Sequence, residues 1–256
     1  LDTGMGRMGL RADDPVEAIL RIARLPGVEV EGVFTHFPSA DEKDISFTRK
    51  QIASFRRTLA DLSARGLEPR YRHIANSAGI IVFGKESAFD LVRPGVCAYG
   101  MFPDLEIANK YSDSVDLRPA LKLVSALIKV TEYTRPWPIG YGRTFHARPG
   151  SRIGVVPVGY GDGYRRGLSN NGVALVHGRR VPVVGRVSMD MITIDLTELP
   201  EGASVGDEVV LLGEQRWGDR SASFLAEEMA DRLNTISYEI TCGLTSRIPR
   251  VYSSKS

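Results

Sequence analysis

The hydrophobic pattern of this chain changes near Leu117-Arg118-Pro119, and this change constrains the fold more than any other feature. Before it, short β-rich runs alternate with helical patterns. After it, β-rich runs follow one another, and Gly, Pro, Asp and Asn separate them at intervals of roughly eight to twelve residues. Alternating strands and helices predict a parallel sheet, whereas closely spaced strands predict an antiparallel one. We therefore expect two domains, residues 1–116 and 117–256.

In the first domain, a polar cluster follows each predicted strand. Asp14-Pro15 predicts the start of a helix over Val16–Leu25, because proline is favoured in a first turn. The other expected elements are strands ending near Leu1–Asp2, over Val28–Phe34, Tyr71–Ala75 and Leu91–Val96, a helix over Asp44–Arg65 closed by Gly66, and a short helix after Asn76-Ser77-Ala78-Gly79. Polar groups at strand ends are typical of a (β/α) barrel. A doubly wound sheet would place polar groups similarly, so the pattern alone leaves both open.

The sequence of the second domain predicts mainly antiparallel β structure. The expected strands are Ala120–Tyr133, Ser151–Tyr160, Val173–Val176, Arg180–Val187, Met191–Leu196 and Glu208–Leu212. His177-Gly178-Arg179-Arg180 predicts a hairpin turn. Ser221–Leu233 predicts a helix, because its apolar residues recur at helical spacing.

Composition narrows the class of protein. The 256 residues are 43% hydrophobic and 25% charged with a formal net charge of +2, so nothing favours a nucleic-acid or membrane partner. No apolar run is long enough to span a bilayer, and no signal-peptide pattern opens the chain. Cys97 and Cys242 are far apart and lack metal-type spacing, so we expect free thiols, no metal site and a cytoplasmic location.

The number of strand-plus-helix units is also informative. We count about four, and a closed barrel has eight in roughly 250 residues. The chain also has no initiator Met. We therefore expect on the order of 120 residues upstream of Leu1. Half a barrel would leave parallel edges open, so we expect the chain to be unstable and inactive by itself.

Seven short motifs arrive in a specific order: DTGMGR, HIANS, RPG, YGRTF, GYGDG, MD and SYE. Each is weak alone, but in this order they resemble alanine racemase, and the resemblance runs from Leu1 nearly to Tyr252. This family combines a pyridoxal phosphate (PLP)-binding (β/α)8 barrel with a β domain. The chain thus resembles the C-terminal half of such a TIM-like barrel followed by that β domain. Pro38, Ser188 and Met191 depart from the family pattern, which bears on substrate preference.

The resemblance implies interconversion of L-alanine and D-alanine, supplying D-alanine for peptidoglycan, in a homodimer with shared active sites. It also implies the residues that bind PLP. Arg93 would donate to the ring nitrogen, which we favour over the alternative of a surface arginine before a turn. His73 would stack on the ring or support it. The other implied cofactor residues are His36, Asn76, Ser77, Gly95, Val96 and Tyr238, of which the last five would bind the phosphate.

Racemisation removes a proton from one face of Cα and delivers one to the other, which two bases on opposite faces can do. The resemblance assigns Tyr141 to one face. It assigns the other to a PLP-bearing lysine that we expect upstream of Leu1. A phenol has a reference pKa of about 10, so a tyrosine base needs nearby cations. Arg7 and His36 match family positions around this tyrosine and the substrate carboxylate.

The same resemblance implies the substrate pocket. Tyr160, Met189 and Arg186 resemble residues of the entryway and pocket, and a wall of methionine and tyrosine favours a small side chain. Asp162 and Asp190 would hold these loops or serve structure alone. We reject as PLP anchors the lysines outside a Gly/Ala-rich strand-end motif, namely Lys85, Lys110, Lys122 and Lys129.

Two alternatives stay open at this point. One is a racemase of broad amino-acid specificity, which the pocket around Met189 and Tyr160 would distinguish. The other is a non-catalytic module for PLP binding or dimerisation. The presence of Tyr141 together with Arg7 and Arg93 argues against the second alternative, because binding alone needs no second base.

Overall fold

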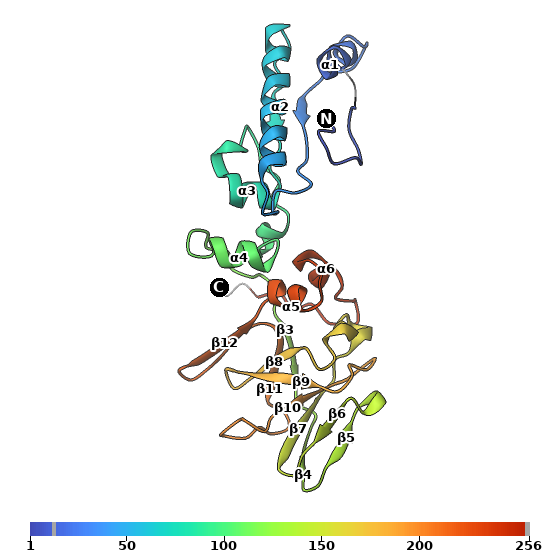
Figure 1. Cartoon of the computed structure of the whole chain (residues 1–256), viewed down its shortest axis with the longest axis vertical. Helices are drawn as coiled ribbons and strands as arrows, with labels where there is room; N and C mark the ends of the chain where they lie inside the picture. Colours follow the sequence, from blue (N-terminus) through green and yellow to red (C-terminus); the bar gives the residue numbers. More distant parts are fainter. Residues whose placement is uncertain (12–13, 254–256) are drawn as a thin grey trace. The chain divides into compact units, whose positions relative to one another are not determined.

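A computed structural model of the chain describes residues 1–11 and 14–253. The chain forms two compact units, Leu1–Leu117 and Arg118–Ser256, and each is described by itself (Figure 1). Among the described residues, no helix is both long and apolar enough to cross a membrane. Within 1–11 and 14–253, no three His, Cys, Asp or Glu side chains gather as a metal site would require.

The first unit alternates strands and helices, as expected. Its elements are α1 (Pro15–Ala23), β1 (Gly32–Phe34), α2 (Ser46–Ala64), β2 (Tyr71–His73), α3 (Ser77–Phe83), η1 (Gly84–Glu86), η2 (Val96–Tyr99) and α4 (Leu105–Tyr111). β1 and β2 pair in parallel, with Phe34 opposite His73. The side chain of Asp14 caps α1 by accepting from the N–H of Glu17, and Pro15 occupies the first turn.

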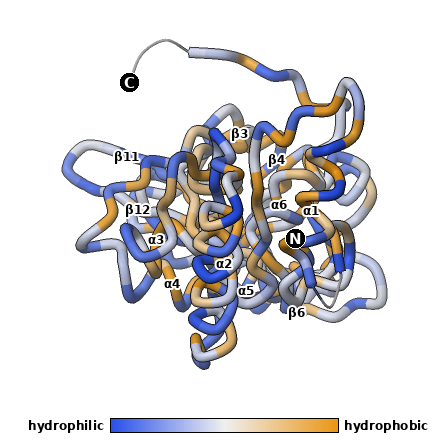
Figure 2. The backbone as a smooth tube through the Cα atoms, turned by 90° about the horizontal axis from the view of Figure 1, so that it is seen from above, coloured by the Kyte–Doolittle hydropathy of each residue, from blue (hydrophilic) through white to orange (hydrophobic). Residues whose placement is uncertain are grey.

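The core of this unit lies between the helices and the short parallel sheet. Ile52, Phe55 and Leu62 from α2 are at most 1% exposed, and they pack with Val16 and Ile19 from α1. Hydrophobic and hydrophilic residues are interspersed along the backbone of the whole chain (Figure 2). This packing fixes the carboxyl ends of β1 and β2.

The expected strand over Leu91–Val96 is only partly correct. Backbone N–H groups of Asp90 and Arg93 donate to the carbonyls of Arg72 and Ala75, so this segment runs beside β2. No regular strand forms over these six residues, and Val96 instead begins η2. Pro94 has no N–H to continue the pairing. The short contact is nevertheless enough to place Arg93 beside the end of β2.

The second unit is dominated by antiparallel sheet. Its elements are β3 (Leu123–Ala126), β4 (Lys129–Tyr133), β5 (Trp137–Ile139), η3 (Tyr141–Arg143), β6 (Phe145–Ala147), β7 (Ser151–Val156), η4 (Tyr160–Asp162), η5 (Arg166–Leu168), β8 (Val173–Val176), β9 (Arg179–Val184), β10 (Ile192–Asp195), β11 (Glu208–Trp217), β12 (Arg220–Phe224), α5 (Ala226–Arg232) and α6 (Ser237–Cys242). The strand order is β12-β11-β8-β9-β10-β7-β4, with β3 also pairing with β11, and β5 pairs with β6 as a separate hairpin (Figure 1). The predicted turn at His177-Gly178 is confirmed, since Val176 pairs with Arg179 across it.

Two expectations in this unit were wrong in detail. The run Ala120–Tyr133 forms two strands, β3 and β4, which pair with different neighbours. The predicted helix over Ser221–Leu233 is a strand in its first part: β12 pairs with β11, and Phe224 lies opposite Gly213 with its side chain fully buried. Only residues 226–232 form a helix, α5. Sheet pairing thus overrides the helical spacing of apolar residues here.

Candidate functional site

Arg93 is the centre of a polar cluster at the carboxyl ends of the parallel strands. Its guanidinium donates to Nδ1 of His73, to Nδ1 of His36 at 3.2 Å and to the carbonyl oxygen of Thr35 at 2.8 Å. Phe34 lies 5.4 Å beneath the guanidinium carbon and stacks on His73. Three segments that are far apart in sequence therefore meet at one half-buried cation.

The partners of Arg93 fix the protonation of both histidines. A guanidinium only donates, so each imidazole accepts through an unprotonated Nδ1 and carries its proton on Nε2. The pKa of His36 is lowered by burial and then by the positive charges of Arg93 and Arg7. Burial and Arg93 lower the pKa of His73 in the same way. Both imidazoles are therefore held neutral beside a permanent cation.

Arg7 belongs to the same region. The glycine-rich loop that carries it folds around Asp2, whose carboxylate accepts from the N–H groups of Gly4, Met5 and Gly6 at 2.9–3.0 Å. These bonds hold the pKa of Asp2 below its usual value. The exposed Arg7 is close enough for its charge to act on His36. The loop therefore adds a second positive charge.

Ser77 joins the start of α3 to the segment after Arg93. Its side-chain oxygen is buried and accepts from the N–H groups of Gly95 at 2.9 Å and Cys97 at 3.4 Å. The hydroxyl proton of Ser77 can then be donated elsewhere. Asn76 is used internally: its amide oxygen caps Gly79 and its amide nitrogen donates to Phe37. The Ser77 hydroxyl thus holds the backbone of the segment from Gly95 to Cys97 against the start of α3.

Tyr141 lies in the loop of the β5–β6 hairpin, in the second unit. Its side chain is 73% exposed. Gly140, Gly142 and Arg143 all have positive φ, between 51° and 70°, and glycine adopts such angles without steric strain. A Cβ on Gly140 would lie 3.3 Å from the backbone nitrogen of Arg186. The loop therefore crosses the end of β9 at backbone contact.

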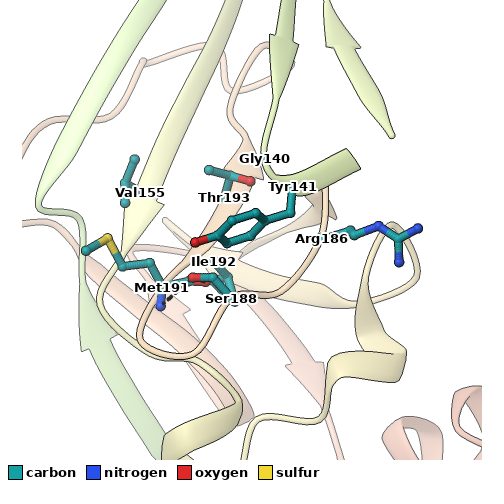
Figure 3. A pocket seen from close by; sticks show the side chains of 8 residues that line it. All are labelled: Gly140, Tyr141, Val155, Arg186, Ser188, Met191, Ile192 and Thr193. Carbon is teal, nitrogen blue, oxygen red and sulfur yellow. Dashed lines mark hydrogen bonds between the residues drawn. The ribbon is translucent and has the colours of Figure 1, made fainter. Parts of the chain in front are cut away.

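A pocket of about 460 Å³ opens beside Tyr141 (Figure 3). Its floor is the sheet, where Val155 of β7 pairs with Thr193 of β10. The tyrosine hydroxyl extends toward Met191 and Ser188, while the guanidinium of Arg186 points away from the ring (Figure 3). The lining residues are Gly140, Tyr141, Val155, Arg186, Ser188, Met191, Ile192 and Thr193. The phenol thus extends over a small and largely apolar hollow.

Tyr160 and Met189, both expected in the substrate pocket, lie on two adjoining turns. The N–H groups of Tyr160 and Gly161 donate to the carbonyls of Ser188 and Met189 at 3.0 and 2.8 Å. Ser188 closes its own turn by hydrogen bonds with the backbone of Met191. Because Ser188 and Met191 line the pocket, these turns connect Tyr160 and Met189 to the surroundings of Tyr141.

Arg247 links the same two turns from outside. Its guanidinium donates to Asp190 at 2.6 Å and lies 3.3 Å from the carboxylate of Asp162. The other carboxylate oxygen of Asp162 accepts from the N–H of Gly159. Asp162 and Asp190 thus hold the turns through one shared arginine. Sequence patterns do not identify Arg247, because it lies far along the chain outside any motif.

The structure groups the expected site residues into two sets. Tyr238 lies in α6 and is half-buried, so it is not a buried strand residue. One set belongs to the first unit: Arg7, His36, His73, Asn76, Ser77, Arg93, Gly95 and Val96. The other belongs to the second: Tyr141, Tyr160, Arg186, Met189 and Tyr238. Each unit therefore carries its own part of the candidate site.

Known proteins match nearly the whole chain. Residues 1–103 match the family described as alanine racemase, N-terminal domain, and residues 120–252 match alanine racemase, C-terminal domain. An alanine racemase from Halothermothrix orenii is 42% identical over 100% of this chain and 65% of its own length. Alanine racemase 2 from Caldanaerobacter subterraneus is 43% identical over 98% of this chain and 63% of its own length. The chain thus spans slightly less than two thirds of these relatives.

Solved structures agree with the sequence matches. An alanine racemase from E. faecalis superimposes with a TM-score of 0.85 and 37% identity, covering 99% of this chain and 64% of that one. The structure of alanine racemase from Bacillus anthracis with bound L-Ala-P gives a TM-score of 0.82 and a sequence identity of 36%. The match covers 99% of this chain and 63% of that one. These structures therefore share the fold of this chain.

Proposed function

The chain belongs to the alanine racemase family, with part of a TIM-like barrel followed by an antiparallel β domain, and we propose that the protein racemises alanine with PLP. The observation that carries this proposal is the set of acceptors that orients the Arg93 guanidinium, together with Tyr141 beside a pocket. The alternative of a binding module is less well supported, because Arg7, Arg93 and Tyr141 occur together in one chain. Kinetics on larger amino acids would distinguish the alternative of broad specificity.

The residues of the first unit fit PLP by their chemistry. Arg93 cannot accept a proton, so its N–H would keep the pyridine nitrogen unprotonated. When bound, PLP supplies the electron sink that weakens the Cα–H bond of the substrate, and an unprotonated ring nitrogen moderates that sink. His73 and His36, held neutral, keep the guanidinium oriented. We infer that this arrangement suppresses side reactions such as transamination.

The phosphate is assigned to Ser77, Gly95 and Val96. Ser77 accepts from two backbone N–H groups, which leaves its proton to be donated to an anion. Gly95 has no side chain, so a phosphate oxygen can approach its backbone closely. Asn76 contributes by capping α3 with its side-chain amide oxygen, which accepts from the N–H of Gly79. Tyr238 is proposed as a further phosphate ligand on the family resemblance.

Tyr141 is proposed as the base on one face of Cα. Its phenol must lose a proton to act, so it needs the cations that the family pattern places nearby, Arg7 among them. Arg7 would also hold the substrate carboxylate by charge-assisted hydrogen bonds. The opposite face needs a second base, for which the resemblance implies a PLP-bearing lysine. Met189 and Tyr160 would limit the substrate side chain to about the size of a methyl group.

The test is Tyr141→Phe in the full-length protein, assayed with each enantiomer labelled with deuterium at Cα. We expect PLP absorbance to persist and racemisation to fall by about 100-fold or more, as for loss of a general base. The isotope effect should change for one enantiomer only. Unchanged rates in both directions would remove Tyr141 from the mechanism.

We also propose that the two sets of residues meet across a homodimer, as the resemblance implies. The test mixes two inactive variants, Arg93→Ala and Tyr141→Phe, after unfolding and refolding them together. If one subunit supplies the cofactor cluster and the other the phenol, mixed dimers contain one intact site, and activity returns to roughly a quarter of wild type on statistical grounds. Absence of recovery, with mixed dimers shown by mass spectrometry, contradicts shared sites.

A further inference from the structure

The loop that carries Tyr141 is held by a residue outside every motif. Asn170 follows η5 and has φ of 55°. Its side-chain nitrogen donates to the hydroxyl of Thr144 at 3.0 Å, just past the Tyr141 loop. Its side-chain oxygen accepts from the N–H of Gly185 at 2.6 Å, and its own N–H donates to the Gly185 carbonyl at 3.2 Å.

These three hydrogen bonds join the two backbone segments that cross beneath Tyr141. Gly140 lies close to the backbone of Arg186. Gly185 lies close to Ile139, because a Cβ added to Gly185 would be only 3.2 Å from the Ile139 carbonyl oxygen. Asn170 contacts one segment at Thr144 and the other at Gly185. The adjoining Ser169 adds a bond of the same kind, because its hydroxyl oxygen accepts from the N–H of Val187.

We propose that Asn170 is a positioning residue that sets the place of the Tyr141 phenol. This rests on the proposed function, since it deepens the role of the same loop. An exposed side chain on a loop with successive positive φ angles has little packing to define its position. The bonds from Asn170 fix the loop against the end of β9, and Asn170 is not among the residues that line the pocket beside Tyr141. Position 170 needs a residue that adopts positive φ and that both donates and accepts hydrogen bonds. Asparagine meets both requirements on one short side chain.

The primary variant is Asn170→Gly, which keeps the backbone conformation and removes both side-chain bonds. We expect kcat to fall by about 10- to 100-fold, the effect of a displacement of about 1 Å in a reacting group. KM for alanine, PLP absorbance and Tm should change little. The isotope effect should rise for the same enantiomer that Tyr141→Phe identifies. A merely structural role would lower Tm and leave the isotope effects symmetric.

Asn171→Gly is the matched control. The side chain of this neighbouring asparagine donates to the carbonyl of Arg232 in α5 rather than to the Tyr141 loop. We expect its kcat to stay within about twofold of wild type. If Asn170→Gly does not fold, Thr144→Val removes the same bond from the other side and leaves Asn170 in place. It should lower kcat in the same direction.

A double variant separates this inference from the proposed function. If Asn170 acts through Tyr141, then Asn170→Gly combined with Tyr141→Phe is no slower than Tyr141→Phe alone. Multiplicative losses, or a normal kcat in Asn170→Gly while Tyr141→Phe is inactive, overturn the role of Asn170. A normal rate in Tyr141→Phe instead overturns the proposed function itself.

Discussion

Gly159 lies so close to Met189 that a Cβ on the glycine would be 2.3 Å from the Met189 carbonyl oxygen. No side chain fits in this space, because carbon and oxygen atoms do not approach so closely. The contact lets the turn that follows Gly159 bond to the turn that carries Met189. A glycine of the GYGDG motif is thus explained by the backbone that it touches.

Gly159→Ala should therefore displace the Met189 turn. We expect the full-length protein to lose about 1–3 kcal/mol of stability, as for overpacking of a core, and to lose alanine affinity as well. Gly167→Ala is the control, because its Cβ would meet only the end of the flexible Leu233 side chain. Urea unfolding and KM measure the two effects. Equal losses in both variants would show that the backbone contact is unimportant.

Arg247→Gln should loosen the two turns without unfolding the protein. Arg247 is half exposed, and its pKa is raised by the hydrogen bond to Asp190 and by the charge of Asp162. An exposed ion pair contributes little to stability, so Tm should change by only a few degrees. We expect Arg247→Gln to have a higher KM for alanine and to accept serine better than wild type does. Arg247→Lys keeps the charge, so its KM should lie between the two. An unchanged KM for both substrates contradicts this role.

The neutral histidines predict how stability depends on pH. Folding lowers the pKa of His36 and His73 below the ordinary value of 6.5, so the unfolded chain binds more protons in acid. Their neutral forms are fully compatible with the fold above pH 6.5, and stability falls as the pH drops below that value. His73→Asn keeps an acceptor for Arg93 but cannot be protonated. Its Tm should therefore fall less than that of wild type between about pH 7.5 and 5, and parallel curves would contradict the assignment.

Tyr164 offers a test of a buried hydroxyl. Its side chain is 1% exposed, and its oxygen has no hydrogen-bond partner among the described residues. Burial raises the pKa of this phenol above its usual value. An unsatisfied buried group costs about 1–3 kcal/mol, so Tyr164→Phe should leave stability unchanged or raise it by about 1 kcal/mol. Tyr164→Ala should lose about 3–5 kcal/mol by creating a cavity. A loss in the phenylalanine variant would reveal a bound water.

Local signals predicted the elements whose ends the sequence itself encodes. Asp14 and Pro15 mark the start of α1, and Gly66, with φ of 80°, follows the end of α2. The turn at His177-Gly178 likewise needs two positive φ angles. In each case the conformational preference of one or two residues decides the structure, so no knowledge of distant neighbours is needed.

Elements that depend on distant partners were missed. Phe224 has helical spacing with its apolar neighbours, yet it belongs to a strand because β11 pairs with it. The Leu91–Val96 segment pairs with β2 only as far as Arg93. The candidate site shows the same division: motifs predict roles for Tyr141 and Arg93, whereas the hydrogen bonds of Asn170 and Arg247 join segments that sequence spacing does not bring together.

The groups around Arg93 leave its positive charge free to attract anions. The guanidinium donates its hydrogen bonds to carbonyl and imidazole groups, which orient the cation but do not cancel its charge. With Arg7 nearby, a standing positive potential persists at the strand ends throughout the neutral pH range. Chloride and small carboxylates such as propionate should accumulate there. Ionic strength would thus set how quickly any negatively charged metabolite arrives.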